Sequence, residues 1–140
     1  QIGADLLLQT LNRLQSNDIK PAPQNHDKAT YAPMLQKNDG HIDWNKSAYE
    51  LETFIRGVTP WPGAFTFFNN RRLKLFKAKC IDKEISAPPG TVLKTFPGEL
   101  YIATGKGALS IVELQGASGK RLYTEAFLRG CQIPVGTVLT

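Results

Sequence analysis

Long apolar runs are absent from this sequence. No stretch approaches the roughly 18 residues that a membrane-spanning helix needs, and no charged and apolar leader precedes a cleavage site. Cysteine is equally scarce, with only Cys80 and Cys131 among 140 residues. Two cysteines cannot form a disulfide framework, so we expect two buried free thiols in a reducing compartment. These absences predict a cytoplasmic protein without a membrane partner.

The residues that usually perform catalysis or bind metals are also few. His26 and His41 each lack a second ligand at metal-binding spacing, so we expect no metal site. No nucleophile elbow and no glycine-rich phosphate loop is present. The acidic residues available for acid–base catalysis lie on segments expected to be exposed: Asp43, Glu50, Glu52, Asp82 and Glu84. The sequence therefore predicts no independent active site.

Positive charge is plentiful and unevenly placed. The net charge is +5, and residues 1–40 contribute none of it, because four basic residues there balance four acidic ones. Within residues 71–83 a basic stripe is offset only by Asp82: Arg71, Arg72, Lys74, Lys77, Lys79 and Lys83. Such a stripe attracts polyanions through counterion release. Lysines also protect an exposed strand edge from aggregation, and charge alone leaves both interpretations open.

Apolar residues recur at three- and four-residue spacing near the start of the chain. They predict an amphipathic helix over residues 4–15. A lone helix of about 12 residues is marginal in water, so its leucine stripe must dock on something. The partner is either a domain outside this chain or the remainder of this one. Residues 16–40 contain three prolines and no periodic apolar face, which predicts an extended linker.

Residues 41–140 predict one capped helix followed by many strands. Ser47 is a candidate N-cap that forms a capping box with Glu50, and the helix should span 47–56 and stop at Gly57. Strand patterns follow at 64–68, 72–80, 90–95, 99–103 and 107–115. A change of face near Leu75 and Phe76 predicts a β-bulge.

The C-terminal part of the sequence predicts a short helix and a final strand. The helix should span 124–129 with Thr124 as its cap, and the strand should lie near 135–139. Short strands separated by Gly and Pro turns indicate a mainly β fold. We predict a small, partly open β-barrel of the oligonucleotide-binding type with short helices, preceded by an isolated N-terminal helix and a linker.

Two tryptophans lie next to the 47–56 helix in the sequence. Exposed aromatic side chains can stack on the bases of single-stranded nucleic acid. In a small barrel, however, most aromatic side chains fill the core. We therefore expect Trp44 and Trp61 to pack beside the helix rather than to contact bases.

Several motifs occur in a fixed order along the whole chain: Ala29-Thr30-Tyr31-Ala32-Pro33, Ile42-Asp43-Trp44, Pro60-Trp61-Pro62-Gly63, Ala103-Thr104-Gly105-Lys106-Gly107 and Pro134-Val135-Gly136. In this ordered series the sequence resembles the hinge and C-terminal domain of the methionyl-tRNA formyltransferase family. One departure is Met34, which stands where the family usually has lysine. Lys37 is the nearby lysine that could substitute for it.

The resemblance implies the role of a longer parent enzyme. That enzyme transfers a formyl group from 10-formyltetrahydrofolate to initiator methionyl-tRNA, and its catalytic residues lie in an N-terminal domain absent here. It further implies that residues 1–15 are the last helix of that domain, 16–40 the hinge and 41–140 the tRNA-binding barrel. This chain alone is then expected to be inactive, monomeric and free of bound cofactor. The candidate tRNA-binding residues are all basic: Lys37, Arg56, Arg71, Arg72, Lys74, Lys77, Lys106 and Lys120.

Two other assignments stay open at this point. Nucleotide-sugar formyltransferases and formyltetrahydrofolate hydrolases or dehydrogenases share the tryptophan–proline turn, but their C-terminal domains need not bind RNA. A free-standing barrel that binds single-stranded nucleic acid is the alternative from another class. The uncovered leucine stripe of the 4–15 helix argues against that barrel, and the net positive charge favours the tRNA enzyme.

Overall fold

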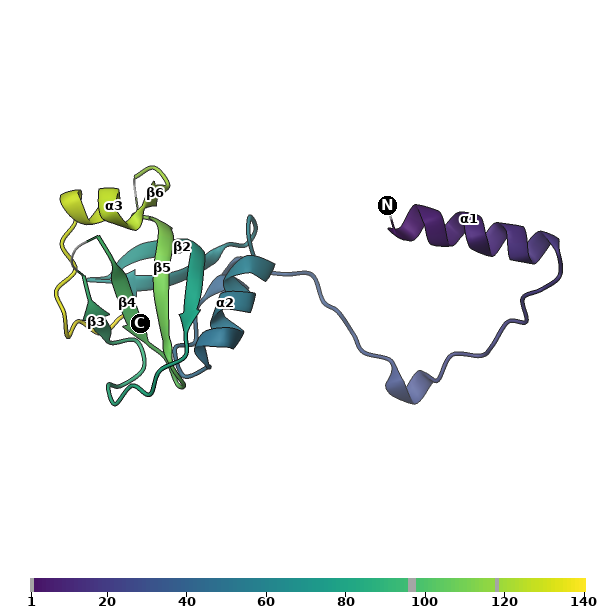
Figure 1. Ribbon diagram of the computed structural model, residues 1–140, viewed down its shortest axis with the longest axis horizontal. Coiled ribbons are helices and arrows are strands. Elements are labelled where there is room, and N and C mark those ends of the chain that lie inside the picture. Colours follow the sequence, from purple (N-terminus) through teal and green to yellow (C-terminus); the bar gives the residue numbers. More distant parts are fainter. Residues whose placement is uncertain (1, 96–97, 118) are drawn as a thin grey trace. The chain divides into compact units, whose positions relative to one another are not determined.

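The computed structural model describes residues 2–95, 98–117 and 119–140 (Figure 1). Its contacts divide the chain into two units, Gln1–Pro33 and Met34–Thr140. Within the described residues, no helix is both long enough and apolar enough to cross a membrane.

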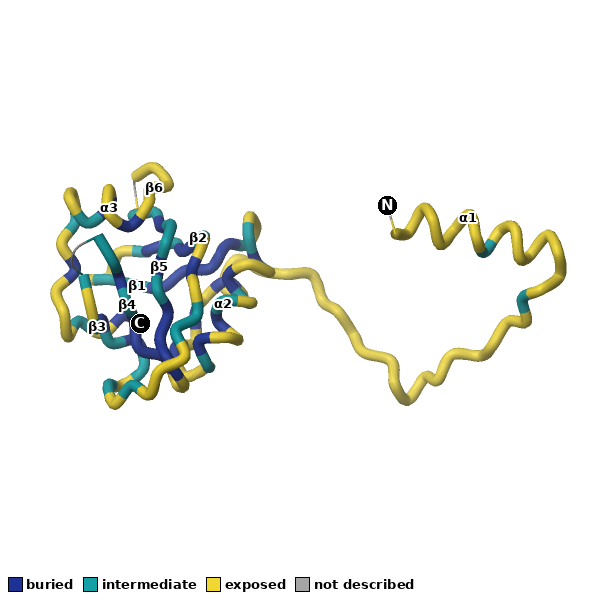
Figure 2. The backbone as a smooth tube through the Cα atoms, viewed as in Figure 1, coloured by how far each residue is buried: buried dark blue, intermediate teal, exposed yellow. Residues whose placement is uncertain are grey.

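The first unit contains the predicted N-terminal helix. Helix α1 spans Ile2–Gln15, so it begins two residues before the predicted start, and none of its residues is buried. Its leucines are between 51% and 62% exposed: Leu6, Leu7, Leu8, Leu11 and Leu14. The linker that follows is irregular except for the 3₁₀ turn η1, His26–Lys28, which the Asn25 side chain caps. Figure 2 shows this unit as an almost continuously exposed backbone.

The second unit is a curled antiparallel sheet, which confirms the predicted mainly β fold. Its strands pair in the order β1-β2-β5-β4-β3, and β6 adds to the end of β5. Their bounds are β1 Ala64–Phe68, β2 Arg71–Ile81, β3 Val92–Lys94, β4 Leu100–Ala103, β5 Ala108–Gln115 and β6 Leu122–Tyr123. The expected strand ranges are reproduced closely, whereas the two-residue β6 was not predicted. The open half-barrel matches the oligonucleotide-binding fold only loosely.

The buried face of the sheet forms the core, as the dark-blue strands of Figure 2 show. Alternate residues of the long strands point inward, and the largest fully buried ones are aliphatic: Leu75, Leu100, Ile102, Leu109 and Leu114. Trp44 is 5% exposed and packs in this core, as predicted. Its indole Nε1 donates a hydrogen bond to Thr66 Oγ1 at 3.1 Å, so the buried ring nitrogen is satisfied.

The last residues of the chain connect the two edge strands of the sheet. Phe67 of β1 donates its backbone N–H to the Thr140 carbonyl at 2.6 Å, and Val92 of β3 donates to Thr137 at 2.8 Å. The predicted strand near 135–139 is nevertheless wrong, because only the isolated bridge between Thr91 and Val138 forms. The turn around Gly136, whose φ is +86°, prevents a regular strand there.

Helix α2, Ala48–Gly57, covers part of β2. The predicted capping box is present: Ser47 Oγ accepts from the Glu50 N–H, and Glu50 Oε2 accepts from the Ser47 N–H at 2.9 Å. The Ser47 hydroxyl also donates to Glu50 Oε2, at 2.6 Å, and this bond, together with the one from the Ser47 N–H, lowers the pKa of the Glu50 carboxyl. Because the folded-state pKa is depressed, this stabilisation is present above the ordinary carboxyl pKa and is lost as the pH falls through the folded value.

Helix α3, Thr124–Gly130, agrees with the predicted range, but its predicted cap is wrong. Tyr123 occupies the N-cap position and makes no side-chain capping bond. Thr124 is 4% exposed, and its hydroxyl donates to the Ile111 carbonyl of β5 at 2.5 Å. The hydroxyl is therefore used to attach the helix to the sheet instead of capping it.

Candidate nucleic-acid interface

The outer face of β2 carries a row of basic side chains. Arg72 and Lys74 lie two residues apart, opposite Phe67 and Phe65 of β1. On the other side of β2, Lys74 pairs with Gln115 and Lys77 with Glu113, so the register shifts by one residue after Leu75. Gln115 and Glu113 are two residues apart and share a face. The predicted β-bulge is thus confirmed, and it brings Lys77 onto the same face as Arg72 and Lys74.

Aromatic rings on this face lie beneath arginine side chains. The Arg72 guanidinium carbon is 3.9 Å from the centroid of the Phe65 ring, and that of Arg121 is 4.5 Å from the centroid of Phe76. Arg121 also forms an ion pair with Glu113. Cation–π contacts of this kind fix the direction of a long side chain. Phe65 and Phe76 therefore support the cations of the face and do not offer open surfaces for base stacking.

The cations of β2 have no acidic partner within the described residues. The four ion pairs found there involve other cations: Arg13, Lys94, Arg121 and Arg129. Arg71 and Lys77 are exposed, and Arg72 and Lys74 are half-buried. Cations that form no ion pair keep their charge available to attract a polyanion.

Two grooves border this basic face. One, of about 710 Å³, is lined by Arg71, Arg72 and Lys120, with Leu73 and Phe127 among its apolar residues. The other, of about 300 Å³, lies between α2 and β2. Four of its lining residues are Arg56, Thr59, Phe76 and Lys77. Five of the eight basic residues predicted from the sequence line these two grooves, and a sixth, Lys74, lies on β2 between Arg72 and Lys77.

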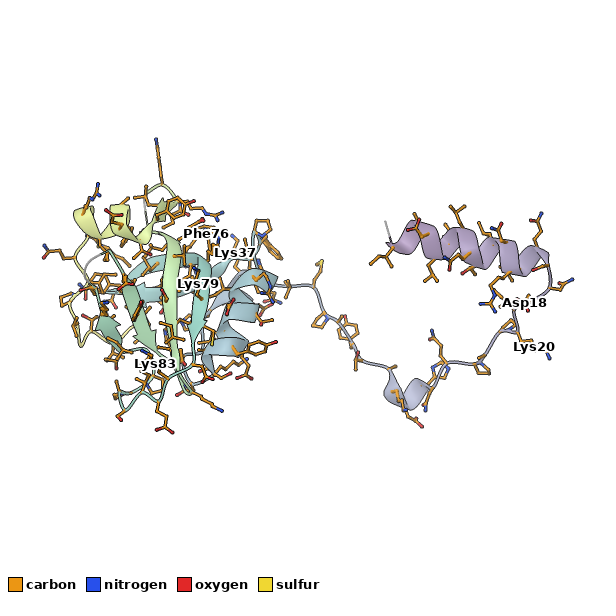
Figure 3. The ribbon with its side chains drawn as sticks, in the orientation of Figure 1. Asp18, Lys20, Lys37, Phe76, Lys79 and Lys83 are labelled. Carbon is orange, nitrogen blue, oxygen red and sulfur yellow. The ribbon has the colours of Figure 1, made fainter. Side chains whose placement is uncertain are left out.

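Lys106 does not join this group. It lies in the turn between β4 and β5, next to Gly107, which packs against the Ile81 carbonyl at the far end of β2. Because an antiparallel strand rises by about 3.4 Å per residue, Arg71 and Ile81 at the two ends of β2 lie about 34 Å apart. Lys106 also lines a small depression together with Asp82 and Glu84. In Figure 3, the labelled residues Phe76, Lys79 and Lys83 mark the course of β2 toward this end of the strand.

Lys37 lies in the hinge, on the 3₁₀ turn η2, Lys37–Gly40. This turn ends against the tryptophan–proline turn: a Cβ on Gly40 would lie 2.1 Å from the Gly63 carbonyl oxygen. Lys37 is exposed and is labelled in Figure 3. It therefore lies on the turn that contacts the tryptophan–proline turn and not on β2.

The prediction that Trp61 packs in the core was wrong, because its side chain is 56% exposed. Ala48, Leu51 and Ile55 of α2, continued by Val58, already complete the buried stripe at helical spacing. The spacing of these residues in the sequence could have shown that the buried stripe ends at Val58, before Trp61.

Other reactive groups are committed to structural contacts. Glu52 Oε2 accepts the backbone N–H of Cys80 at 3.0 Å, beside the stretch of β2 that has no β1 partner. Burial raises the pKa of the Cys80 thiol, and the nearby charge of Glu52 adds to this. Both cysteines are free thiols, but they are half-buried and not fully buried as expected. Within residues 2–95, 98–117 and 119–140, no three His, Cys, Asp or Glu side chains gather as metal ligands.

Comparison with known proteins gives the family. Residues 34–132 match the family described as formyl transferase, C-terminal domain. The chain belongs to this family. The resemblance found in the sequence is thereby confirmed, and the formyl transferase C-terminal domain comprises α2 and the sheet with its basic face.

Curated relatives extend the match to nearly the whole chain. Methionyl-tRNA formyltransferases from Desulfotalea psychrophila and Agathobacter rectalis are 45% and 41% identical to it. Each match covers 99% of this chain, but only 43% and 44% of the relative. The chain thus spans less than half the length of these relatives.

Solved structures reproduce the fold of this formyl transferase C-terminal domain. A variant of HypX from Aquifex aeolicus has a TM-score of 0.60 at 22% identity, covering 93% of this chain and 24% of HypX. HypX in complex with tetrahydrofolic acid gives 0.59 at 21% identity, covering 95% and 26%. At these identities the likeness concerns the fold alone.

Proposed function

We propose that this formyl transferase C-terminal domain binds tRNA through the basic face of β2, as part of a methionyl-tRNA formyltransferase. The longer protein would transfer formyl from 10-formyltetrahydrofolate to initiator methionyl-tRNA in translation initiation, in the cytoplasm. The observation that carries the proposal is the row of cations on β2, which form no ion pair within the described part of the chain and are bordered by two grooves. The proposed contact residues are Arg56, Arg71, Arg72, Lys74, Lys77 and Lys120, with Lys37 in the hinge.

The pairing of β2 argues against the alternative that its lysines merely protect a strand edge. Residues 71–75 pair with β1, residues 74–81 pair with β5, and α2 packs against the same strand. β2 is thus an interior strand between β1 and β5, and beyond the end of β1 the Cys80 N–H donates to Glu52 of α2, so the strand presents no long open edge for charge to protect. Polyanion binding accounts for this row of charges, since arginine and lysine are the usual ligands of phosphate.

The relatives support tRNA over the other substrates of this superfamily. The two relatives described above are both named methionyl-tRNA formyltransferase. Nucleotide-sugar and formyltetrahydrofolate enzymes would need no cationic row on this domain.

Titration of the 140-residue chain with initiator tRNA at several salt concentrations tests the proposal. Each neutralised phosphate contributes roughly 0.9 to the slope of log affinity against log salt. With at least three contacts on β2, we expect a slope of about −3 or steeper. A slope near zero, or no binding at low salt, would contradict the assignment.

We further infer that α1 packs on a part of the longer protein that this chain does not cover. Its leucine stripe is more than half exposed, and the relatives are more than twice as long as the chain. Catalysis and folate binding would belong to that part, so the chain alone would be inactive and monomeric.

Amide hydrogen exchange tests this inference about α1. In a dilute solution of the chain, we expect residues 2–15 to exchange almost as fast as an unfolded peptide, because an isolated helix of this length is marginal in water. The amides of β2 and β5 provide the protected reference. Strong protection throughout α1 would show instead that the helix packs on its own barrel.

A further inference from the structure

Trp61 is a large aromatic side chain held out of the core on a fixed turn. Within this turn the Gly63 N–H donates to the Val58 carbonyl at 2.8 Å, and the Thr59 hydroxyl donates to the Ile55 carbonyl at 2.7 Å. Pro60 and Pro62 restrict the backbone on both sides of the tryptophan. An exposed indole on a rigid support loses little conformational entropy when something stacks on it.

Basic residues lie on the elements next to the turn that carries Trp61. Arg56 lies in the last turn of α2. Thr59 follows this turn, and its hydroxyl is hydrogen-bonded to Ile55, the residue before Arg56. Thr59, Arg56 and Lys77 line the same groove between α2 and β2, together with Glu52. The turn η2, which carries Lys37, contacts Gly63 through Gly40. No ion pair in the described residues involves Arg56, Lys37 or Lys77.

The carboxylates of α2 do not offset these charges by pairing with them. Glu50 Oε2 is bound to Ser47, and Glu52 Oε2 accepts from the Cys80 backbone. An aromatic ring next to exposed cations is the arrangement by which proteins bind single-stranded nucleic acid: the ring stacks on a base while the cations neutralise phosphates. A protein partner would need both acidic groups for the cations and an apolar pocket for the indole, whereas a single strand of nucleic acid provides phosphates and bases along its whole length.

We propose that Trp61 is a stacking platform for one unpaired base of the bound RNA, with Arg56, Lys77 and Lys37 holding the adjoining phosphates. This inference rests on the proposed function and adds a base contact to a surface otherwise built for phosphates. Bases within a duplex are stacked on each other and cannot reach the ring. The site therefore discriminates between unpaired and paired RNA.

Intrinsic fluorescence of the full chain provides the test, because the chain has only two tryptophans and Trp44 is buried. The probes are the oligoadenylate A10 and a ten-base-pair A·U duplex. We expect A10 to quench the fluorescence of the unmodified chain and to leave that of Trp61→Leu unchanged. The Trp61→Leu variant should bind A10 about tenfold more weakly, the order expected for loss of one base stack, and bind the duplex as before.

Two further variants keep the test specific. Trp61→Phe retains an aromatic face and should recover most of the A10 affinity. Tyr49→Leu removes a similarly exposed aromatic side chain near the other end of α2 and should leave binding unchanged. Binding of A10 without quenching, or equal weakening for A10 and the duplex in Trp61→Leu, would overturn the stacking role while leaving the proposed function standing. Absence of binding to both probes and to tRNA would reject the two together.

Discussion

Replacing Arg72, Lys74 and Lys77 together by Gln is expected to flatten the salt dependence of tRNA binding by about two to three units of log–log slope. The bulge places all three on one face, and each lost phosphate contact removes roughly 0.9 from the slope. Glutamine is chosen because the Arg72 side chain covers Phe65, and alanine would uncover that ring. Surface substitutions of this kind usually change stability by no more than about 0.5 kcal/mol each.

A second triple variant controls for the loss of net charge. Lys46, Lys83 and Lys106 are exposed and lie near the opposite end of β2. Replacing these three by Gln changes the net charge equally but should leave the slope within about one unit of the unmodified chain. Equal slopes for both triple variants would mean that tRNA responds to total charge and not to the face of β2.

Replacing Gly105 by Ala is expected to destabilise the domain by about 3 kcal/mol, at the upper end of the range for overpacking. A Cβ on Gly105 would lie 1.8 Å from the carbonyl oxygen of Asn45. The same residue donates its N–H to the carbonyls of Trp44 and Lys46, each at 2.9 Å. A shift that relieves the clash would therefore break the connection between the turn and the segment that carries the buried Trp44.

Thermal unfolding followed by circular dichroism measures this effect. For a domain of this size, 3 kcal/mol corresponds to a fall in Tm of about 12 to 24 °C. Gly57→Ala is the matched control, because no atom lies within 4 Å of its added Cβ at the end of α2. That control should be neutral or stabilise the domain by up to about 1 kcal/mol. Similar melting temperatures for the two variants would mean that the turn at Gly105 adapts freely.

The secondary structure could be predicted where local chemistry determines it. The Ser47–Glu50 capping box set the start of α2, and strand patterns bounded by Gly, Pro and Asn turns located β1, β2 and β5. Prediction from local sequence failed where a residue distant in the sequence provides the hydrogen-bond partner of a side chain. Thr124 has the chemistry of a cap, but Ile111 of β5 takes its hydroxyl, and nothing near Thr124 in the sequence reveals that acceptor.

The composition of the candidate site was only partly predictable. The bulge was visible in the sequence as a change of face, and with it the alignment of Arg72, Lys74 and Lys77. The separation of Lys106 from these residues was not visible. It depends on the antiparallel pairing of β5 with β2, which puts the β4–β5 turn beside Ile81 and far from Arg71. Only the strand order contains that information.

We propose above that the outer face of β2 is the surface that contacts tRNA. The most direct measurement is a map of backbone amide chemical shifts in the ¹⁵N-labelled chain as initiator tRNA is added at low salt. We expect the largest changes at residues 71–77 and 119–121, with residues 82–84 and 104–107 nearly unchanged. Changes concentrated at 82–84 and 104–107, with residues 71–77 unaffected, would contradict the assignment of the β2 face as the tRNA-binding surface.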